Sequence, residues 1–180
     1  MLVTIHAVTD DLRTDLLARL RRGDESAWSA LYDSLAGDIR AYVARIGAAS
    51  PDDVLGETMV QLVRSLSSFD GTTAELRPWV FRIARNRVID AGRRQSRRPR
   101  ETQLSDEDAS SVEGPEEQLT GDLSEMLAGL TRDQRDAVWL RHVVGLSTDD
   151  TAAVVGKAPE AVAALTHRAL RRLRSIFDRD

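Results

Sequence analysis

Residues 77–90 read RPWVFRIARNRVID, and this stretch decides the fold because it joins a helical pattern to a basic surface. Its apolar side chains recur at helical spacing and form one stripe with a residue just beyond the stretch: Val80, Ile83, Ala84, Val88 and Ala91. The polar side chains project elsewhere: Arg82, Arg85, Asn86 and, further on, Arg93. We therefore predict a long helix from about residue 75 to residue 94 that is basic on one side.

Charge is sorted along the chain around this helix. Residues 77–100 contain nine arginines and one acid, whereas residues 101–125 contain nine acids and no base, a contrast that the formal net charge of -4 conceals. Guanidinium groups suit phosphates and base edges, so the arginine-rich helix is a candidate nucleic-acid surface. Residues 96–121 are acidic, poor in apolar side chains and interrupted by Pro99 and Pro115, so we expect a flexible linker there.

Residues 50–66, upstream, carry the signals of another helix. Ser50 suits the N-cap, Pro51 the first helical position, and the following two acids the positive end of the helix dipole. The expected buried side consists of Leu55, Met59, Leu62 and Leu66, and the expected polar face of Asp53, Glu57, Gln61 and Arg64. Judged alone, this polar face is more simply a solvated surface than a binding site.

The residues after the acidic stretch are typical of a helix-turn-helix unit. Two capping boxes place helix starts, at Thr131 with Gln134 and at Ser147 with Asp150. Gly145 predicts the end of the first helix, Gly156 the tight turn after the second, and Pro159 the start of a last helix that reaches about residue 177.

The last helix has two contrasting faces. Its inward residues are Val162, Leu165, Ala169, Leu173 and Ile176. Its outward residues are Glu160, Ala163, Ala164, His167, Arg168 and Arg171. Such an outer face fits a DNA major groove, and a solvated amphipathic helix with a basic end explains the same pattern about equally well.

Composition excludes several function classes. The chain has no cysteine and its three histidines are scattered, so neither a disulfide framework nor a recognisable metal site is expected, and the acidic run at 106–108 lacks calcium-loop spacing. The glycine-rich phosphate loop, the zinc-protease helix and the nucleophile elbow are all missing. No signal peptide or membrane span is visible. We expect a cytoplasmic protein without catalytic residues, metal or cofactor.

Together these stretches resemble sigma factors of the extracytoplasmic-function (ECF) type, in the sigma-70 superfamily. The resemblance covers nearly everything outside the linker and the first twenty residues, through residues 24–32, 51–59, 69–70, 77–90, 130–135, 140–147 and 167–174. The most specific string is Trp79-x-x-x-Ile83-Ala84-Arg85-Asn86-x-x-x-Asp90.

The resemblance implies both fold and function. The expected fold is all-α, with a region two helical bundle over residues 10–95, a region four helix-turn-helix domain over residues 122–178, and the flexible acidic linker of residues 96–121 between them. The implied function is that of an alternative sigma factor, the promoter-specificity subunit of bacterial RNA polymerase. Such a subunit binds the core enzyme, recognises the minus-35 and minus-10 promoter elements and starts transcription.

The resemblance also assigns roles to particular residues. The clamp helices of the polymerase largest subunit would bind Asp52, Asp53, Glu57 and Gln61. The minus-10 element, as it opens, would meet Phe69, Asp70, Arg82, Arg85, Asn86 and Arg93. The minus-35 element would meet Lys157, Glu160, Ala163, Ala164, His167, Arg168 and Arg171. Region four would also bind the flap of the second-largest subunit, and the family makes an anti-sigma factor a plausible further partner.

Three positions depart from the family pattern. Ala163 and Ala164 replace a basic and a hydroxyl residue, so they can touch a thymine methyl but cannot donate a hydrogen bond. Gly56 replaces a glutamine inside the helix that would meet polymerase. The competing hypothesis is a stand-alone helix-turn-helix regulator or adaptor, which would bind duplex operator DNA without the core enzyme.

Overall fold

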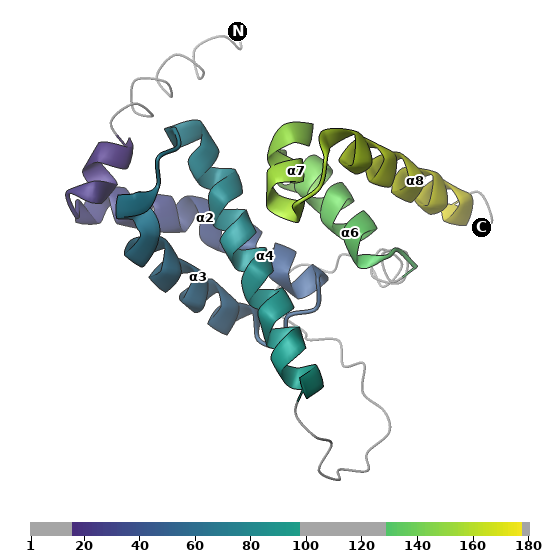
Figure 1. The fold of residues 1–180 in the computed structure, drawn as a ribbon, viewed down its shortest axis with the longest axis horizontal. Helices are drawn as coiled ribbons and strands as arrows, with labels where there is room; N and C mark the ends of the chain where they lie inside the picture. The colour runs from purple at the N-terminus through teal and green to yellow at the C-terminus, as the bar shows by residue number, and fades with distance from the viewer. Residues whose placement is uncertain (1–15, 98–128, 178–180) are drawn as a thin grey trace, which may run out of the picture.

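The computed structural model describes residues 16–97 and 129–177, and every regular element in these two ranges is helical (Figure 1). The linker expected at residues 96–121 lies outside the described residues, except that its first two residues still belong to a helix. The acidic run at 106–108 and the first ten residues also lie outside them. The all-α prediction is confirmed for the part of the chain that the structure describes.

The first range forms an N-terminal helical domain. After a helical segment over residues 16–21 come α2 (Glu25–Arg45), α3 (Pro51–Ser65), the short 3₁₀ turn η1 (Leu66–Ser68) and the long α4 (Thr73–Arg97). Its core lies among α2, α3 and α4, where Tyr42 and Phe81 pack with ring centroids 5.6 Å apart. The side chains buried most completely around this pair are Leu20, Ile39, Val43, Leu62, Leu76 and Val80.

The second range forms a smaller C-terminal domain. It consists of α6 (Arg132–Val138), a π-helical turn η2 (Trp139–Val143), α7 (Thr148–Val155) and α8 (Pro159–Phe177). Both α6 and α7 pack against α8. The tight turn between α7 and α8 is made by Gly156, whose φ of 69° is left-handed and whose N–H bonds back to Ala152. The predicted helix-turn-helix is therefore present.

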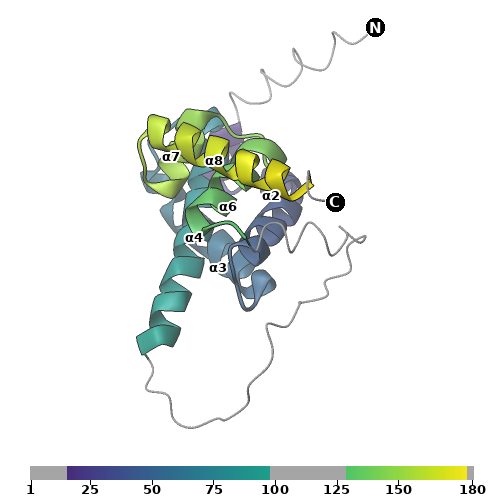
Figure 2. The ribbon, with the colours of Figure 1, turned by 90° about the vertical axis from the view of Figure 1, so that its right-hand side faces the viewer.

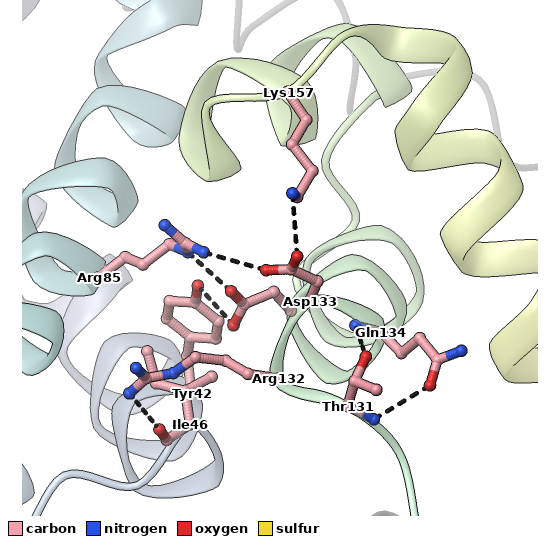
Figure 3. Close-up of polar contacts among 9 residues, drawn as sticks. Tyr42, Ile46, Arg85, Thr131, Arg132, Asp133, Gln134 and Lys157 are labelled. Carbon is pink, nitrogen blue, oxygen red and sulfur yellow. Dashed lines mark hydrogen bonds and ion pairs between the residues drawn. The ribbon is translucent and has the colours of Figure 1, made fainter.

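The helix starts follow the predicted caps. The Ser50 hydroxyl accepts a hydrogen bond from the Asp53 N–H, and the Ser147 hydroxyl accepts one from the Asp150 N–H. The predicted capping box at Ser147 is incomplete, because the Asp150 carboxylate accepts from the Ser147 hydroxyl and not from its backbone N–H. Thr131 and Gln134 form a full capping box, each side chain bonding the other residue's backbone (Figure 3). These caps are local signals, which explains why the sequence predicts them well.

The apolar stripe of α4 departs from the prediction. Val80, Ala84 and Val88 are buried as expected, but Ile83 is half-buried and Ala91 is exposed. The buried face is instead completed by Leu76, Phe81 and Arg85. The prediction that Arg85 shares the exposed basic face is wrong, because this side chain lies three or four residues from Phe81 and Val88 on the inner surface.

The two domains lie against each other. α7 packs along α4, and α6 lies beside the end of α2 (Figures 1 and 2). At this contact Arg132 of α6 donates to the Ile46 carbonyl at 2.9 Å, and the Arg45 guanidinium lies 5.5 Å from the ring centroid of Trp139. The interface thus joins residues that are far apart in the chain.

Replacing Gly56 by alanine should stabilise the protein. Gly56 sits inside α3 with ordinary helical backbone, and an added Cβ would meet no atom within 4 Å. We expect Gly56→Ala to raise the free energy of unfolding by about 1 kcal/mol, measured by urea denaturation. The matched control is Gly156→Ala, which should lower that free energy by about 1 kcal/mol because alanine disfavours the left-handed backbone. A destabilised Gly56→Ala variant would contradict the helical geometry described for α3.

Candidate nucleic-acid and polymerase interfaces

A cleft of about 400 Å³ opens between the end of α3, the loop after η1, and α4. Its lining includes four of the residues predicted for the minus-10 element: Phe69, Asp70, Arg82 and Asn86. Gln61, Ser65, Ser68, Trp79 and Ile83 complete it. Arg82 and Asn86 come from the exposed side of α4, four residues apart, so the helix itself aligns them with the loop.

An aromatic pair forms one wall of this cleft. The rings of Phe69 and Trp79 stack with centroids 4.4 Å apart and planes 22° apart. The backbone at Phe69 is held by Arg21, whose guanidinium donates to the Phe69 carbonyl. Trp79 is half-buried, so it packs against the domain and also shapes the wall. A stacked aromatic wall beside an acid, an amide and a guanidinium is suited to an unstacked base and its phosphate.

The Arg85 side chain does not line this cleft. Its Nε donates to an Asp136 carboxylate oxygen at 2.7 Å, and its Nη2 lies 3.6 Å from Asp133 (Figure 3). The Tyr42 hydroxyl donates to the other Asp136 oxygen at 3.2 Å. Asp136 is fully buried and the Arg85 side chain is 11% exposed. Arg85 therefore joins the two domains in this structure and presents no surface to DNA.

The electrostatics of this cluster act differently on its members. Burial raises the pKa of Asp136, and the hydrogen bond and charge of Arg85 offset this only in part. Burial alone lowers the pKa of Arg85, but the hydrogen bond and charge of Asp136 outweigh it and raise that pKa, so the guanidinium stays charged. Burial, reinforced by the Asp136 charge, raises the pKa of Tyr42, so its hydroxyl stays a donor. Sequence reasoning missed Tyr42 and Asp136 entirely.

The remaining minus-10 candidate is Arg93. It is exposed on the last turns of α4 and lies 3.5 Å from Asp90, its neighbour three residues back. It does not line the cleft. The predicted minus-10 set therefore divides into a group of four around the cleft, one buried arginine at the domain interface and one exposed arginine further along the helix.

The predicted polymerase-binding residues lie on α3. Asp52, Asp53 and Glu57 are exposed, and Asp52 pairs with Arg40 of α2 at 2.7 Å. Gln61 is half-buried, and its side-chain oxygen accepts a hydrogen bond from Arg87 of α4 at 2.9 Å. The sequence pattern missed two apolar side chains on the exposed surface of this helix, Val60 and Val63, which are 50% and 57% exposed.

The outer face of α8 is exposed as predicted. All six of its predicted DNA-facing residues are exposed, and among them Arg168 donates to the Ala164 carbonyl one turn back at 3.2 Å. Lys157 lies in the turn before α8 and points toward α6, where its ammonium group is 2.9 Å from Asp133 (Figure 3). Lys157 is thus engaged by the C-terminal domain itself.

Within residues 16–97 and 129–177, no group of three or more acidic, histidine or cysteine side chains is placed to hold a metal ion. No helix in these same ranges is both long and apolar enough to cross a membrane.

Comparisons with known proteins agree with this architecture. The family model for Sigma-70 region 2 matches residues 31–98, and that for Sigma-70 region 4 matches residues 120–173. The ECF RNA polymerase sigma factor ShbA of Streptomyces griseus is 33% identical over 153 residues, which cover 80% of this chain and 76% of that protein. BldN of Streptomyces coelicolor, another ECF sigma factor, is 30% identical over 174 residues, covering 92% of this chain and 66% of the relative.

A solved structure supports the fold alone. The sigma factor RpoE of Bartonella quintana, crystallised with the anti-sigma factor NepR, matches with a TM-score of 0.68 at 22% identity, over 84% of this chain and 97% of the other.

The region 2 match on the helical bundle and the region 4 match on the helix-turn-helix define a sigma-70 type protein. This chain belongs to the ECF RNA polymerase sigma factor family. It is an alternative sigma factor, a regulatory subunit that acts in transcription initiation and is not itself an enzyme. The competing stand-alone regulator hypothesis does not account for the region two match.

The Phe69–Trp79 stack depends on the absence of a side chain at residue 71. A Cβ built on Gly71 would lie 2.5 Å from the Phe69 ring, so Gly71→Ala must displace that ring. We expect a loss of about 1 kcal/mol in unfolding free energy, the worth of an aromatic pair. The loss should vanish in a Phe69→Ala background, where the alanine at 71 has no ring to displace. Equal losses in both backgrounds, measured by urea denaturation, would show that the stack is not the cause.

Proposed function

We propose that the cleft between η1 and α4 receives an unstacked base of the minus-10 element during promoter opening. The observation that carries this proposal is the convergence of Phe69, Asp70, Arg82 and Asn86 on one cleft of about 400 Å³, from two segments separated in the sequence. The aromatic wall offers stacking, Asp70 and Asn86 offer hydrogen bonds to a base edge, and Arg82 offers a charge to the backbone phosphate.

Two further surfaces complete the proposed assembly. The exposed acids of α3, Asp53 and Glu57, bind the clamp helices of the largest polymerase subunit, with Val60 and Val63 adding apolar area beside them. The outer face of α8 enters the major groove at the minus-35 element, with His167, Arg168 and Arg171 supplying its polar contacts. Region four also binds the polymerase flap. All of this takes place in the cytoplasm.

Base reading by α8 is weak at two positions. Ala163 and Ala164 are exposed at the middle of the DNA-facing surface and can make only apolar contacts. The phosphate contacts of the arginines therefore carry most of the proposed minus-35 affinity, and that affinity falls steeply with salt.

An anti-sigma factor is a further proposed partner. RpoE, which shares this fold, is described in complex with the anti-sigma factor NepR. The same helical surfaces of this chain, α3 and the cleft side of α4, are the ones that such a partner has to cover to keep polymerase and promoter away.

The direct test of the proposed function is run-off transcription with core polymerase on genomic fragments, followed by mapping of the start sites. The chain should direct initiation at a defined set of promoters whose upstream sequences share two elements. Duplex binding to one operator without core enzyme, and no initiation with it, would contradict the proposal.

Reversing the charge of the α3 face should abolish core binding. The double variant Asp53→Lys/Glu57→Lys places two positive charges against the clamp helices, which are proposed to bind acids. We therefore expect its affinity for core polymerase to fall by roughly a hundredfold or more. The control is Asp33→Lys, which changes an exposed acid on α2 and should leave that affinity unchanged. Fluorescence anisotropy with labelled chain measures both, and circular dichroism checks the fold. Undiminished binding by the double variant would remove this face from the proposed interface.

A further inference from the structure

The first two turns of α8 carry almost no side chain that can donate a hydrogen bond. Residues 159–166 read PEAVAALT, and Thr166 is the one residue among them with a side-chain donor. Its hydroxyl is already engaged, because it donates to the Val162 carbonyl at 2.9 Å from a half-buried position. Apart from the proline that begins the helix, the exposed side chains of this stretch are Glu160, Ala163 and Ala164.

The only lysine of the chain does not supply the missing donor. Lys157 lies in the turn before α8, and its ammonium group is 2.9 Å from Asp133 of α6 (Figure 3). Donors on the outer face begin in the third turn, with His167 and Arg168. The recognition helix of a helix-turn-helix meets base edges mainly with its N-terminal residues. In this chain those residues offer one carboxylate and two methyl groups.

This composition restricts which base edges the first two turns can recognise. In the major groove a guanine presents two acceptors, and an adenine presents N7 beside its amino group, so reading either purine fully needs a side-chain donor. A thymine presents its C5-methyl group, which an alanine side chain can contact, and a cytosine presents an amino group, from which a carboxylate accepts a hydrogen bond. Two alanines and a glutamate therefore match pyrimidine edges.

We propose that Ala163 and Ala164 select thymine methyl groups in the minus-35 element and that Glu160 selects the amino group of a neighbouring cytosine. Glu160 precedes the two alanines by three and four residues, so all three lie on one side of the helix. This inference rests on the proposed role of the outer face of α8. The phosphate contacts of the arginines supply most of the affinity, and the pyrimidine contacts decide which sequence is preferred.

Methyl contacts and phosphate contacts respond differently to salt. Removing one methyl group from an apolar contact changes affinity by roughly fourfold, so two thymines together contribute on the order of tenfold. Phosphate contacts weaken steeply as salt rises, because they depend on the release of counterions from DNA. The preference for thymine should therefore stay constant while the total affinity falls, and this separates the two kinds of contact.

The test removes methyl groups from the DNA and leaves the protein unchanged. The probe is a duplex that the holoenzyme, the full chain with core polymerase, enriches from a random-sequence pool. Each thymine of its upstream element is then replaced by deoxyuridine, which keeps the base pair and the O4 acceptor. The holoenzyme should bind the uracil duplex roughly tenfold more weakly at every salt concentration. The same number of replacements between the two promoter elements should change the affinity by less than about twofold.

Two variants assign the contacts to their residues. Ala163→Gly/Ala164→Gly removes the methyl groups on the protein side, so its affinities for the thymine and uracil duplexes should be nearly equal. Ala153→Gly, at an exposed position of α7, is the matched control and should keep the full thymine preference. Glu160→Ala should also keep it, and should lose roughly tenfold discrimination in favour of cytosine at one position. Circular dichroism checks the fold of each variant, and the comparison of duplexes with the parent chain decides the proposal without any variant.

Three results would overturn the inference: equal binding of the two duplexes by the parent holoenzyme, an enriched upstream element without an A·T pair, or a thymine preference that survives in Ala163→Gly/Ala164→Gly. If the parent chain directs initiation and gives any of these results, the proposed function stands and only the thymine reading fails. If the enriched duplexes show the thymine preference and the chain directs no initiation at any start site, the thymine reading stands and the proposed function fails.

Discussion

A single buried carboxylate governs how the two halves of this protein fit together. Asp136 is fully buried, and its two oxygens accept hydrogen bonds from Tyr42 of α2 and Arg85 of α4. A buried charge without such partners costs several kcal/mol, so few relative positions of the domains are allowed while it remains inside. The contact therefore fixes the relative position of the two domains more than it adds to the free energy of unfolding. Arg132 and Trp139 hold the same arrangement at the end of α2, through their contacts with Ile46 and Arg45.

The positions of the proposed functional surfaces depend on this arrangement of the two domains. With α6 fixed against α2 and α4, α7 lies along α4 (Figure 2). Asp150 and Ala153 of α7 therefore come close to the Phe69 and Trp79 rings that wall the cleft. α8 packs on the far side of α6 and α7 and keeps its arginines exposed. The proposed minus-10 cleft, the proposed minus-35 face of α8 and the proposed polymerase-binding acids of α3 are thus all accessible in this arrangement.

The helices were predictable because their signals are local. Ser50, Thr131 and Ser147 bond to residues three positions away, and Gly156 ends the helix that precedes it. Each helix boundary is therefore determined by a few neighbouring residues. The family resemblance named four of the residues that line the cleft, Phe69, Asp70, Arg82 and Asn86. It did not predict Trp79 or Ile83 there, and it added Arg85 and Arg93, which do not line the cleft.

The burial of Arg85 was not predictable, because its partner lies 51 residues away across the domain boundary. A hint was present on both sides. Arg85 falls in line with Phe81 and Val88, and Asp136 in line with Leu140, so each charge sits on an apolar stripe where only a paired ion is tolerated. Gln61 and Lys157 also have partners that the sequence does not reveal. Both are polar residues expected at the surface, and each bonds to a neighbouring helix, Gln61 to Arg87 of α4 and Lys157 to Asp133 of α6.

A double-mutant cycle between Arg85 and Asp136 tests the central claim most directly. The unfolding free energies of the parent chain, Arg85→Met, Asp136→Leu and the double variant give the coupling between the two side chains. Each single variant leaves one buried charge alone, whereas the double variant leaves none, so the account predicts a coupling of about 2 kcal/mol or more. Additive losses, with a coupling near zero, would mean that the two charges do not meet in solution and that this ion pair does not fix region four against region two.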